Sequence, residues 1–299
     1  MVKKLRKSSG SKRILAPGTA FNDDLLIVDH LGGSRKVDIY LCRSKRHDGH
    51  VACKVLREKY ASHESSVKAI WREGRILRHL RHPNIVKGYD VDLTPTPHIV
   101  MQRLHGQTLD TAILQGNQAA FESEEFVDVA LQLADALTYV HASGLLHLDL
   151  KPSNIMYDDG HVTLFDFSVA RSFAPGTDLR TGVGTRDYKS PEQDSQNGAG
   201  YHSDMFSLGV VFYRLLTGGE KPFPSIDLKI GEEGKTKRVL DYAADVRPPA
   251  ELNSAVTDVV SEVAMRAIHP DLKKRFATPS EFKSALEVAS RSESRSLTI

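Results

Sequence analysis

The sequence is short of several features that would define its class. Its two cysteines, Cys42 and Cys53, are too few for a disulfide framework or a four-ligand metal site. Its most apolar run, residues 208–216, is too short to cross a bilayer and contains Arg214. The N-terminus lacks the apolar core of a signal peptide. These absences favour a protein of a reducing compartment, and we expect a cytoplasmic location without a membrane segment.

The chain also lacks an excess of charge of either sign. Its formal net charge is +2 over 299 residues, so no nucleic-acid partner is expected. The cations near the N-terminus precede the first acid, Asp23, and we expect residues 1–20 to form a disordered basic tail rather than a docking arm for anionic partners. The Ser/Arg-rich end, residues 289–299, is also expected to be disordered.

What is present is the composition of a globular protein, with 40% apolar and 26% charged residues. Three apolar runs separated by Gly, Asp and Ser predict an antiparallel meander, and a helical segment ending at His82-Pro83 follows them. Two more strand-like runs complete a small lobe. The predicted strands are residues 25–31, 37–42, 51–54, 86–93 and 98–104, and the predicted helix is residues 65–80.

After Gly106 the pattern becomes mostly helical. Apolar residues recur at helical spacing over residues 127–140, and Asp158-Asp159-Gly160 is typical of a β-hairpin turn. Residues 225–247 are expected to form a solvated loop with a short helix in preference to a docking surface. Further helices are predicted over residues 204–217, 254–268 and 279–288. The fold class is therefore α+β, with a small antiparallel sheet lobe and a larger, mostly helical lobe.

A chemically suggestive loop, HLDLKPSN, occupies residues 147–154 between a predicted helix and the hairpin. Asp149 is suited to accept the proton of an attacking hydroxyl, and Lys151 to neutralise a phosphate in transfer. The side-chain oxygen of Asn154 is a metal ligand of the kind that phosphoryl transfer needs. The alternative reading is an ordinary helix-to-strand turn, since these residue types are frequent in turns.

Asp166 follows the hairpin and supplies a carboxylate of the kind that Mg²⁺ prefers alongside substrate phosphates. Taken alone, it would be an aspartate that ends a strand. Its occurrence beyond the 147–154 loop makes a chance combination a poor explanation.

Together with separated landmarks, these residues resemble the eukaryotic-type (Hanks-type) protein kinase family, Ser/Thr class, and its bacterial members in particular. The landmarks are Val51-Ala52-Cys53-Lys54, Glu73, and Tyr188-Lys189-Ser190-Pro191-Glu192-Gln193 with the later Arg275. The resemblance implies the bilobal protein kinase fold over residues 21–288. Its N-lobe would span about residues 21–103 and its C-lobe about residues 104–288.

The resemblance also implies site residues, the substrate ATP, the cofactor Mg²⁺, and protein partners phosphorylated on Ser/Thr hydroxyls. The implied catalytic residues are Asp149, Lys151 and Asn154, and the implied metal ligands are Asn154 and Asp166. The implied ATP-binding residues are Leu31, Gly32, Gly33, Ile39, Ala52, Lys54, Glu73, Met101, Gln102, Leu104 and Met156. Glu192 would pair with Arg275, and Asp204 would brace the catalytic loop.

The sequence departs from the family pattern in its phosphate-covering loop. Gly32 remains, but Ser34 and Val37 stand where two further glycines are usual. A Cβ restricts positive φ and close approach, so we expect a stiffer lid.

Two further departures lie near the catalytic residues. In the family, an arginine at this position usually binds a phosphorylated residue of the activation loop, and Leu148 replaces it here. Arg171 matches the second cation of the family's phosphate-binding pocket. We therefore expect that phosphorylation at Thr177 or Thr181 is not required for activity. Ser168 replaces the usual glycine of its motif, which restricts the backbone there.

Two other functions remain open from the sequence. A pseudokinase or scaffold would explain the altered glycine loop but not the retained catalytic set. A small-molecule phosphotransferase shares the catalytic-loop pattern but lacks the Pro191-Glu192 segment and its Arg275 partner. The sequence leaves the oligomeric state open.

Overall fold

The computed structural model describes residues 14–115, 123–174, 176–177, 179–230 and 235–296. The chain divides into two compact units. The sheet unit comprises Met1–Arg78 and Gly88–Arg103, and the helical unit comprises His79–Lys87 and Leu104–Ile299. The short stretch His79–Lys87 belongs with the helices because backbone hydrogen bonds join Val86 N to Leu164 O and Leu164 N to Asn84 O, at 3.0 and 2.8 Å.

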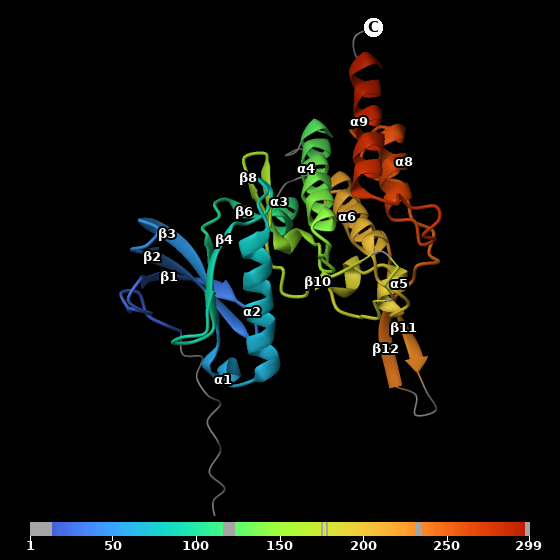
Figure 1. Ribbon diagram of the computed structural model, residues 1–299. Helices are drawn as coiled ribbons and strands as arrows, with labels where there is room; N and C mark the ends of the chain where they lie inside the picture. Colours follow the sequence, from blue (N-terminus) through green and yellow to red (C-terminus); the bar gives the residue numbers. More distant parts are fainter. Residues whose placement is uncertain (1–13, 116–122, 175, 178, 231–234, 297–299) are drawn as a thin grey trace, which may run out of the picture. The chain divides into compact units, whose positions relative to one another are not determined.

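The sheet unit is a five-stranded antiparallel sheet with strand order β1-β2-β3-β5-β4 (Figure 1). The strands are β1 (Leu25–Gly33), β2 (Val37–Ser44), β3 (Gly49–Leu56), β4 (Gly88–Asp92) and β5 (His98–Gln102). The short helix α1 (Glu58–Ala61) and the long helix α2 (Glu64–His79) lie between β3 and β4 in the chain. The predicted meander and its following helix are confirmed.

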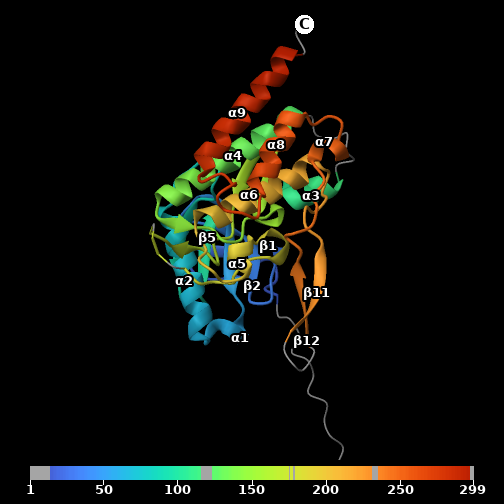
Figure 2. The ribbon, with the colours of Figure 1, turned by 90° about the vertical axis from the view of Figure 1, so that its right-hand side faces the viewer.

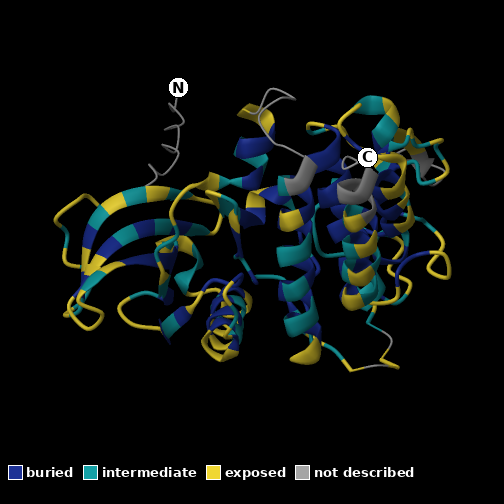
Figure 3. Cartoon of the chain, turned by 90° about the horizontal axis from the view of Figure 1, so that it is seen from above, coloured by how far each residue is buried: buried dark blue, intermediate teal, exposed yellow. Residues whose placement is uncertain are grey.

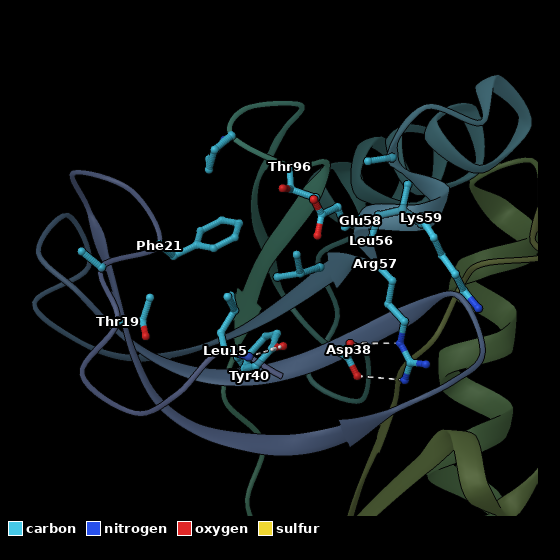
Figure 4. A pocket seen from close by; sticks show the side chains of 14 residues that line it. Leu15, Thr19, Phe21, Asp38, Tyr40, Leu56, Arg57, Glu58, Lys59 and Thr96 are labelled. Atoms are coloured by element: carbon cyan, nitrogen blue, oxygen red, sulfur yellow. Dashed lines mark hydrogen bonds and ion pairs between the residues drawn. The ribbon is translucent and has the colours of Figure 1, made fainter. Parts of the chain in front are cut away.

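One face of this sheet carries an apolar core cluster that includes Tyr40, Cys42 and Cys53. Leu15 and Phe21 from the N-terminal segment pack against it, and the Leu15 N–H donates to the Tyr40 hydroxyl at 3.2 Å (Figure 4). The expectation of disorder up to residue 20 is therefore wrong for residues 14–20, because Leu15 packs on this face and backbone hydrogen bonds join Gly18 and Thr19 to Ile27. Residues 1–13 lie outside the described part of the chain.

The opposite face of the sheet packs against α2, and the packing requires a glycine. A Cβ added to Gly74 would lie 2.5 Å from the Val91 Cβ, so any larger residue would push the helix away from the sheet. Ile70 and Leu77 are buried on the same side of the helix.

The helical unit is built around a deeply buried helix, α6 (Tyr201–Leu216). Helix α4 (Ser123–Ala142) lies beside it, with α8 (Asp258–Ala267) and α9 (Pro279–Ser296), as Figures 1 and 2 both show. In Figure 3 the buried colour runs along the helices where they meet. Shorter helices are α3 (Leu109–Gln115), α5 (Pro191–Asp194) and α7 (Pro249–Leu252).

Helix α9 continues to Ser296, whereas disorder was expected from residue 289. Ala289 is only 1% exposed, so packing holds the helix beyond its last strongly apolar residue, Val288. The following Ser, Glu and Arg residues contain no helix-breaking Gly or Pro. Residues 297–299 lie outside the described part of the chain.

Small strands frame the loops of this unit. The predicted hairpin is confirmed as β8 (Ile155–Asp158) paired with β9 (His161–Leu164), and β6 (Gln107–Thr108) adds a third strand. Its turn residues Asp159 and Gly160 have φ of 47° and 79°, as a two-residue hairpin turn requires. Strand β7 (Leu145–Leu146) pairs with β10 (Arg171–Ser172), and single 3₁₀ turns form at Pro152–Asn154 and Arg186–Tyr188.

A second hairpin, β11 (Ser225–Ile230) and β12 (Lys235–Leu240), replaces the loop and short helix expected for residues 225–247. The expectation was wrong because charged residues obscured a period-two pattern, in which Ile226 and Leu228 alternate with polar residues. A backbone hydrogen bond from Asp241 N to Pro224 O, at 2.9 Å, closes its base.

Candidate active site

The sheet unit holds a buried ion pair at the predicted nucleotide-contacting positions. The Lys54 ammonium on β3 lies 2.7 Å from Glu73 Oε1 on α2, and the two residues are only 7% and 2% exposed. In the strand register Ile39 lies opposite Lys54, and Ala52 lies opposite Met101. Because side chains alternate along a strand, these four residues share one face of the sheet.

The turn between β1 and β2 explains how the altered glycine loop is accommodated. Gly32 and Gly33 have φ of 134° and 157°, and a Cβ on Gly33 would lie 2.4 Å from Val37 O. Ser34 N donates to Val37 O at 2.8 Å and closes the turn. Ser34 and Val37 are not among the described residues with positive φ, so this conformation does not require glycine at either position.

In the helical unit the predicted base, Asp149, lies within a group of polar side chains. Its Oδ2 is 2.9 Å from Lys151 Nζ. The Asn154 amide donates to the Asp149 carbonyl at 2.9 Å and to Oδ2 at 3.2 Å. The structure thus brings together the three residues that were predicted to be catalytic.

Thr185 also belongs to this group, and it was not among the predicted site residues. Its hydroxyl donates to Asp149 Oδ1 at 2.7 Å and accepts from Lys151 Nζ at 2.6 Å. Thr185 lies more than thirty positions after Asp149 in the chain, and a lone threonine carries no local pattern that would reveal the contact. It connects the base to the segment before the 3₁₀ turn Arg186–Tyr188.

Asn154 and Asp166, the predicted metal ligands, are linked through the backbone. Phe165 N donates to Asn154 O at 2.9 Å, which places Asp166 one residue from that contact. The Asn154 amide nitrogen donates two hydrogen bonds to Asp149. The Oδ1 of Asn154 accepts no hydrogen bond from the described residues. A carboxylate and an amide oxygen are the hard donors that Mg²⁺ prefers, so this donor set fits the ion.

The loop of residues 147–154 is braced by Asp204 of α6, as predicted. The buried Asp204 carboxylate accepts hydrogen bonds from His147 N and Leu148 N, at 2.9 and 2.7 Å, and lies 2.9 Å from His141 Nε2. Burial opposes the charge of Asp204, but these hydrogen bonds and the nearby histidines outweigh it and keep its pKa below the usual value.

His147 is fully buried, and burial lowers its pKa, so the ring is neutral at pH 7. Its ring packs edge-on against Phe167, with centroids 4.7 Å apart. His147 Nδ1 accepts from Asp149 N at 3.3 Å, which ties the ring to the backbone of the predicted base.

Leu148, at the position where arginine is usual in the family, lies in an apolar cluster. It is 1% exposed and packs with Leu146 and Ala199; Phe173, Leu179 and Val183 border the cluster. The Gln193 amide donates to Leu148 O and Val183 O, at 2.9 and 2.8 Å. Arg171 Nη1 donates to the carbonyls of Val169 and Ala170.

The predicted Glu192–Arg275 pair is confirmed. Arg275 Nη1 lies 3.0 Å from Glu192 Oε1, and the arginine side chain is 0% exposed. The Ser203 hydroxyl also donates to Glu192 Oε1 at 3.0 Å, so α5, α6 and the turn before α9 meet at this carboxylate.

The predicted adenine contacts are divided between the two units. Ile39, Ala52, Met101 and Gln102 belong to the sheet unit, and Leu104 and Met156 to the helical unit. Leu31, at the edge of β1, is 54% exposed.

Comparison with family models decides the family. Residues 27–286 match the model described as the protein kinase domain. This chain belongs to the protein kinase family. The match covers both units of the kinase and all of the predicted site residues.

Bacterial Ser/Thr kinases are among the relatives of this kinase. It is 33% identical to the serine/threonine-protein kinase PknB of Mycolicibacterium smegmatis and 32% identical to Pkn1 of Myxococcus xanthus, over 86% and 88% of its own length. A probable serine/threonine-protein kinase of Clostridium perfringens is 30% identical over 83%. The chain spans only 41%, 38% and 36% of the lengths of these three relatives.

Solved structures show the same fold. The kinase domain of Mycobacterium tuberculosis PknI matches with a TM-score of 0.70 at 22% identity, over 93% of this kinase and 99% of that chain. The bilobal kinase fold, with an antiparallel sheet lobe and a helical lobe, is thereby established. In the described residues, no helix is both long and apolar enough to cross a membrane.

A pocket of about 780 Å³ in the sheet unit is separate from the Lys54 site (Figure 4). Asp38, Tyr40 and Val55 line it, and these residues lie on the face of the sheet opposite to Lys54. Its most polar feature is the Arg57–Asp38 ion pair, at 2.9 Å. The pocket therefore does not coincide with the predicted nucleotide contacts.

Proposed function

We propose that this kinase is an active protein-serine/threonine kinase that transfers the γ-phosphoryl group of ATP to protein hydroxyls. The observation that carries the proposal is the arrangement at Asp149, whose carboxylate is held by Lys151, Asn154 and Thr185. Phosphoryl transfer needs positioning and charge stabilisation more than covalent chemistry, and this arrangement supplies both.

Each residue takes a role that matches its contacts. Asp149 orients the attacking hydroxyl and accepts its proton, and Lys151 neutralises charge on the phosphoryl group in transfer. Lys54, held by Glu73, contacts the α- and β-phosphates. Asn154 and Asp166 hold Mg²⁺, which when bound offsets the negative charge of the phosphates.

The remaining predicted ATP contacts complete the proposal. The backbone of the Gly32-Gly33 turn covers the phosphates, and the backbone of Gln102 and Leu104 bonds the adenine. Leu31, Ile39, Ala52, Met101 and Met156 provide its apolar surroundings. We further propose a cytoplasmic location, which the two free, buried cysteines support.

The pseudokinase alternative is disfavoured by the β1–β2 turn. Its glycines remain where φ is positive, and Ser34 closes the turn without strain. The small-molecule alternative is disfavoured by the Glu192–Arg275 pair, which belongs to the segment that such phosphotransferases lack.

The test is Mg-ATP-dependent autophosphorylation of the purified chain, mapped by mass spectrometry. Wild type should incorporate phosphate on Ser/Thr residues, and Asp149→Asn should lower the rate by about 10²-fold or more. Asp159→Asn, in the exposed hairpin turn, is the matched control and should retain the wild-type rate. Equal rates for Asp149→Asn and wild type would remove Asp149 from the reaction. ATP binding without turnover would establish the pseudokinase. Phosphorylation of a small molecule such as an aminoglycoside, but of no protein, would establish the small-molecule phosphotransferase.

A further inference from the structure

The outer face of α2 carries a basic stripe centred on the only tryptophan of the chain. Lys68, Trp71, Arg75 and Arg78 follow one another at intervals of three and four residues, so they form one ridge along the helix. All four are exposed, and Trp71 is 39% exposed. We call these four residues the α2 stripe.

Two cations of the stripe, Lys68 and Arg78, have acidic partners that are exposed or shared. Glu64 lies 2.5 Å from Lys68, but both side chains are more than 70% exposed, and such pairs contribute little. Arg78 lies 3.9 Å from Asp90, which also pairs with Arg46 at 3.0 Å. Both cations therefore remain accessible to carboxylates of a partner, and Arg75 is exposed between them on the same ridge.

The residue types indicate a protein partner. Exposed tryptophan and arginine are the types that dominate binding energy at protein interfaces, because each offers a large surface at which water is excluded. A complementary partner would place an apolar side chain on the Trp71 ring and carboxylates beside the cations. From residue 68 to residue 78 the helix rises about 15 Å, the length of an acidic segment of about three helical turns.

We propose that the α2 stripe docks an acidic segment of a partner protein, with apolar residues covering Trp71 and Asp or Glu side chains pairing with Lys68, Arg75 and Arg78. A nucleic acid fits less well, because the stripe is a single convex ridge and the net charge of +2 supplies no broad attractive field.

The location of the stripe bears on the kinase site. Glu73, which holds Lys54, projects from the buried side of the same helix, two positions from Trp71. The docking surface and the Lys54–Glu73 ion pair therefore lie on opposite sides of α2.

The test uses the sole tryptophan as the reporter. The full chain is titrated with a synthetic helical peptide of Glu and Leu long enough to cover the stripe, and Trp71 emission is recorded. We expect a saturable blue shift, because the ring leaves water. Raising the salt concentration should weaken the binding. Arg75→Glu with Arg78→Glu should weaken it at least about tenfold, since two of the three cationic partners of the carboxylates change sign.

Matched controls separate docking from general charge attraction. Lys273→Glu with Lys274→Glu changes the net charge equally at exposed positions of the other unit, and should leave the affinity unchanged. Melting temperatures of both double variants establish that they are folded. No saturable shift with the acidic peptide, or equal binding of a peptide with Lys in place of Glu, would overturn the proposal. Tighter binding of an oligo-dT strand than of the acidic peptide would also overturn it. So would an emission shift that depends on kinase concentration and not on peptide, because it would indicate self-association.

Discussion

The two carboxylate oxygens of Asp149 have different partners. Thr185 donates to Oδ1, whereas Lys151 and Asn154 approach Oδ2. A carboxylate held from both sides keeps its direction without substrate, which lowers the cost of orienting it in the reaction. Thr185 is thus a positioning residue in the proposed mechanism.

Replacing Thr185 tests this positioning role. Thr185→Val removes the hydroxyl at nearly constant volume and should lower kcat by about tenfold or more, while Thr185→Ser should retain most of it. The measurement is steady-state phosphorylation of a peptide substrate, with KM for ATP recorded alongside. Similar kcat values for the valine and serine variants would show that the hydroxyl does not position Asp149.

His147 makes stability depend on pH. Its folded pKa is lowered from 6.5, so below pH 6.5 the unfolded chain binds a proton that the native ring does not. Native stability should therefore fall as the pH drops below 6.5.

His147→Asn isolates this contribution, because asparagine retains an acceptor for Asp149 N without a titrating ring. Urea unfolding at pH 7.5 and 5.5 should show a smaller loss of stability in the variant than in wild type. Parallel losses in the two proteins would show that His147 is not the group responsible.

At the scale of elements, apolar contacts join residues 179–183 to the loop of residues 147–154. Leu148, Leu179 and Val183 share one cluster, and Gln193 bonds the backbone on both sides of it. Leu148 adopts φ of 63°, an uncommon conformation for leucine that the bonds to Asp204 and Gln193 sustain. Because residue 148 is a leucine, this position offers no arginine to bind a phosphate.

Removing the candidate phosphorylation sites should therefore have little effect. Thr177→Ala with Thr181→Ala is expected to retain activity within about twofold, because Leu148 stands at the position where an arginine would bind a phosphorylated threonine. Substrate phosphorylation is measured before and after phosphatase treatment. Val183→Asp provides the contrast, since a carboxylate in the cluster should destabilise the segment. A tenfold loss of activity in the double alanine variant would show that phosphorylation of these threonines is required.

At the scale of the whole molecule, Glu192 and Arg275 join segments 83 residues apart. The arginine also donates to His202 O and His269 O, so one buried side chain connects α5, the start of α6 and the turn before α9. A buried pair of this kind is costly to break, because the remaining charge lacks a partner.

Double-mutant analysis should reveal this coupling. Arg275→Met should lower the free energy of unfolding by about 3–5 kcal/mol. Adding Glu192→Gln should cost less than the sum of the single changes, because it removes the charge left unpaired. Urea denaturation of all four proteins measures the coupling, and strictly additive losses would contradict it.

Much of the architecture was predictable because it depends on local periodicity. The meander, α2, α4 and the hairpin at Asp159-Gly160 each carry a strong repeat or turn signal. The hairpin β11–β12 and the last turns of α9 were missed because charged residues mask weak patterns. Packing, as at Ala289, then decides whether such segments are ordered.

The sequence by itself determined the family and the two-unit organisation, and it predicted a catalytic set, because these follow from residue types at separated landmarks. Only the tertiary structure decided that Thr185 holds Asp149, that Leu148 is buried in an apolar cluster, and that Trp71 lies within an exposed basic ridge on the side of α2 away from Glu73. These are contacts or exposures of side chains distant in sequence or on opposite sides of a helix, and no local pattern specifies them.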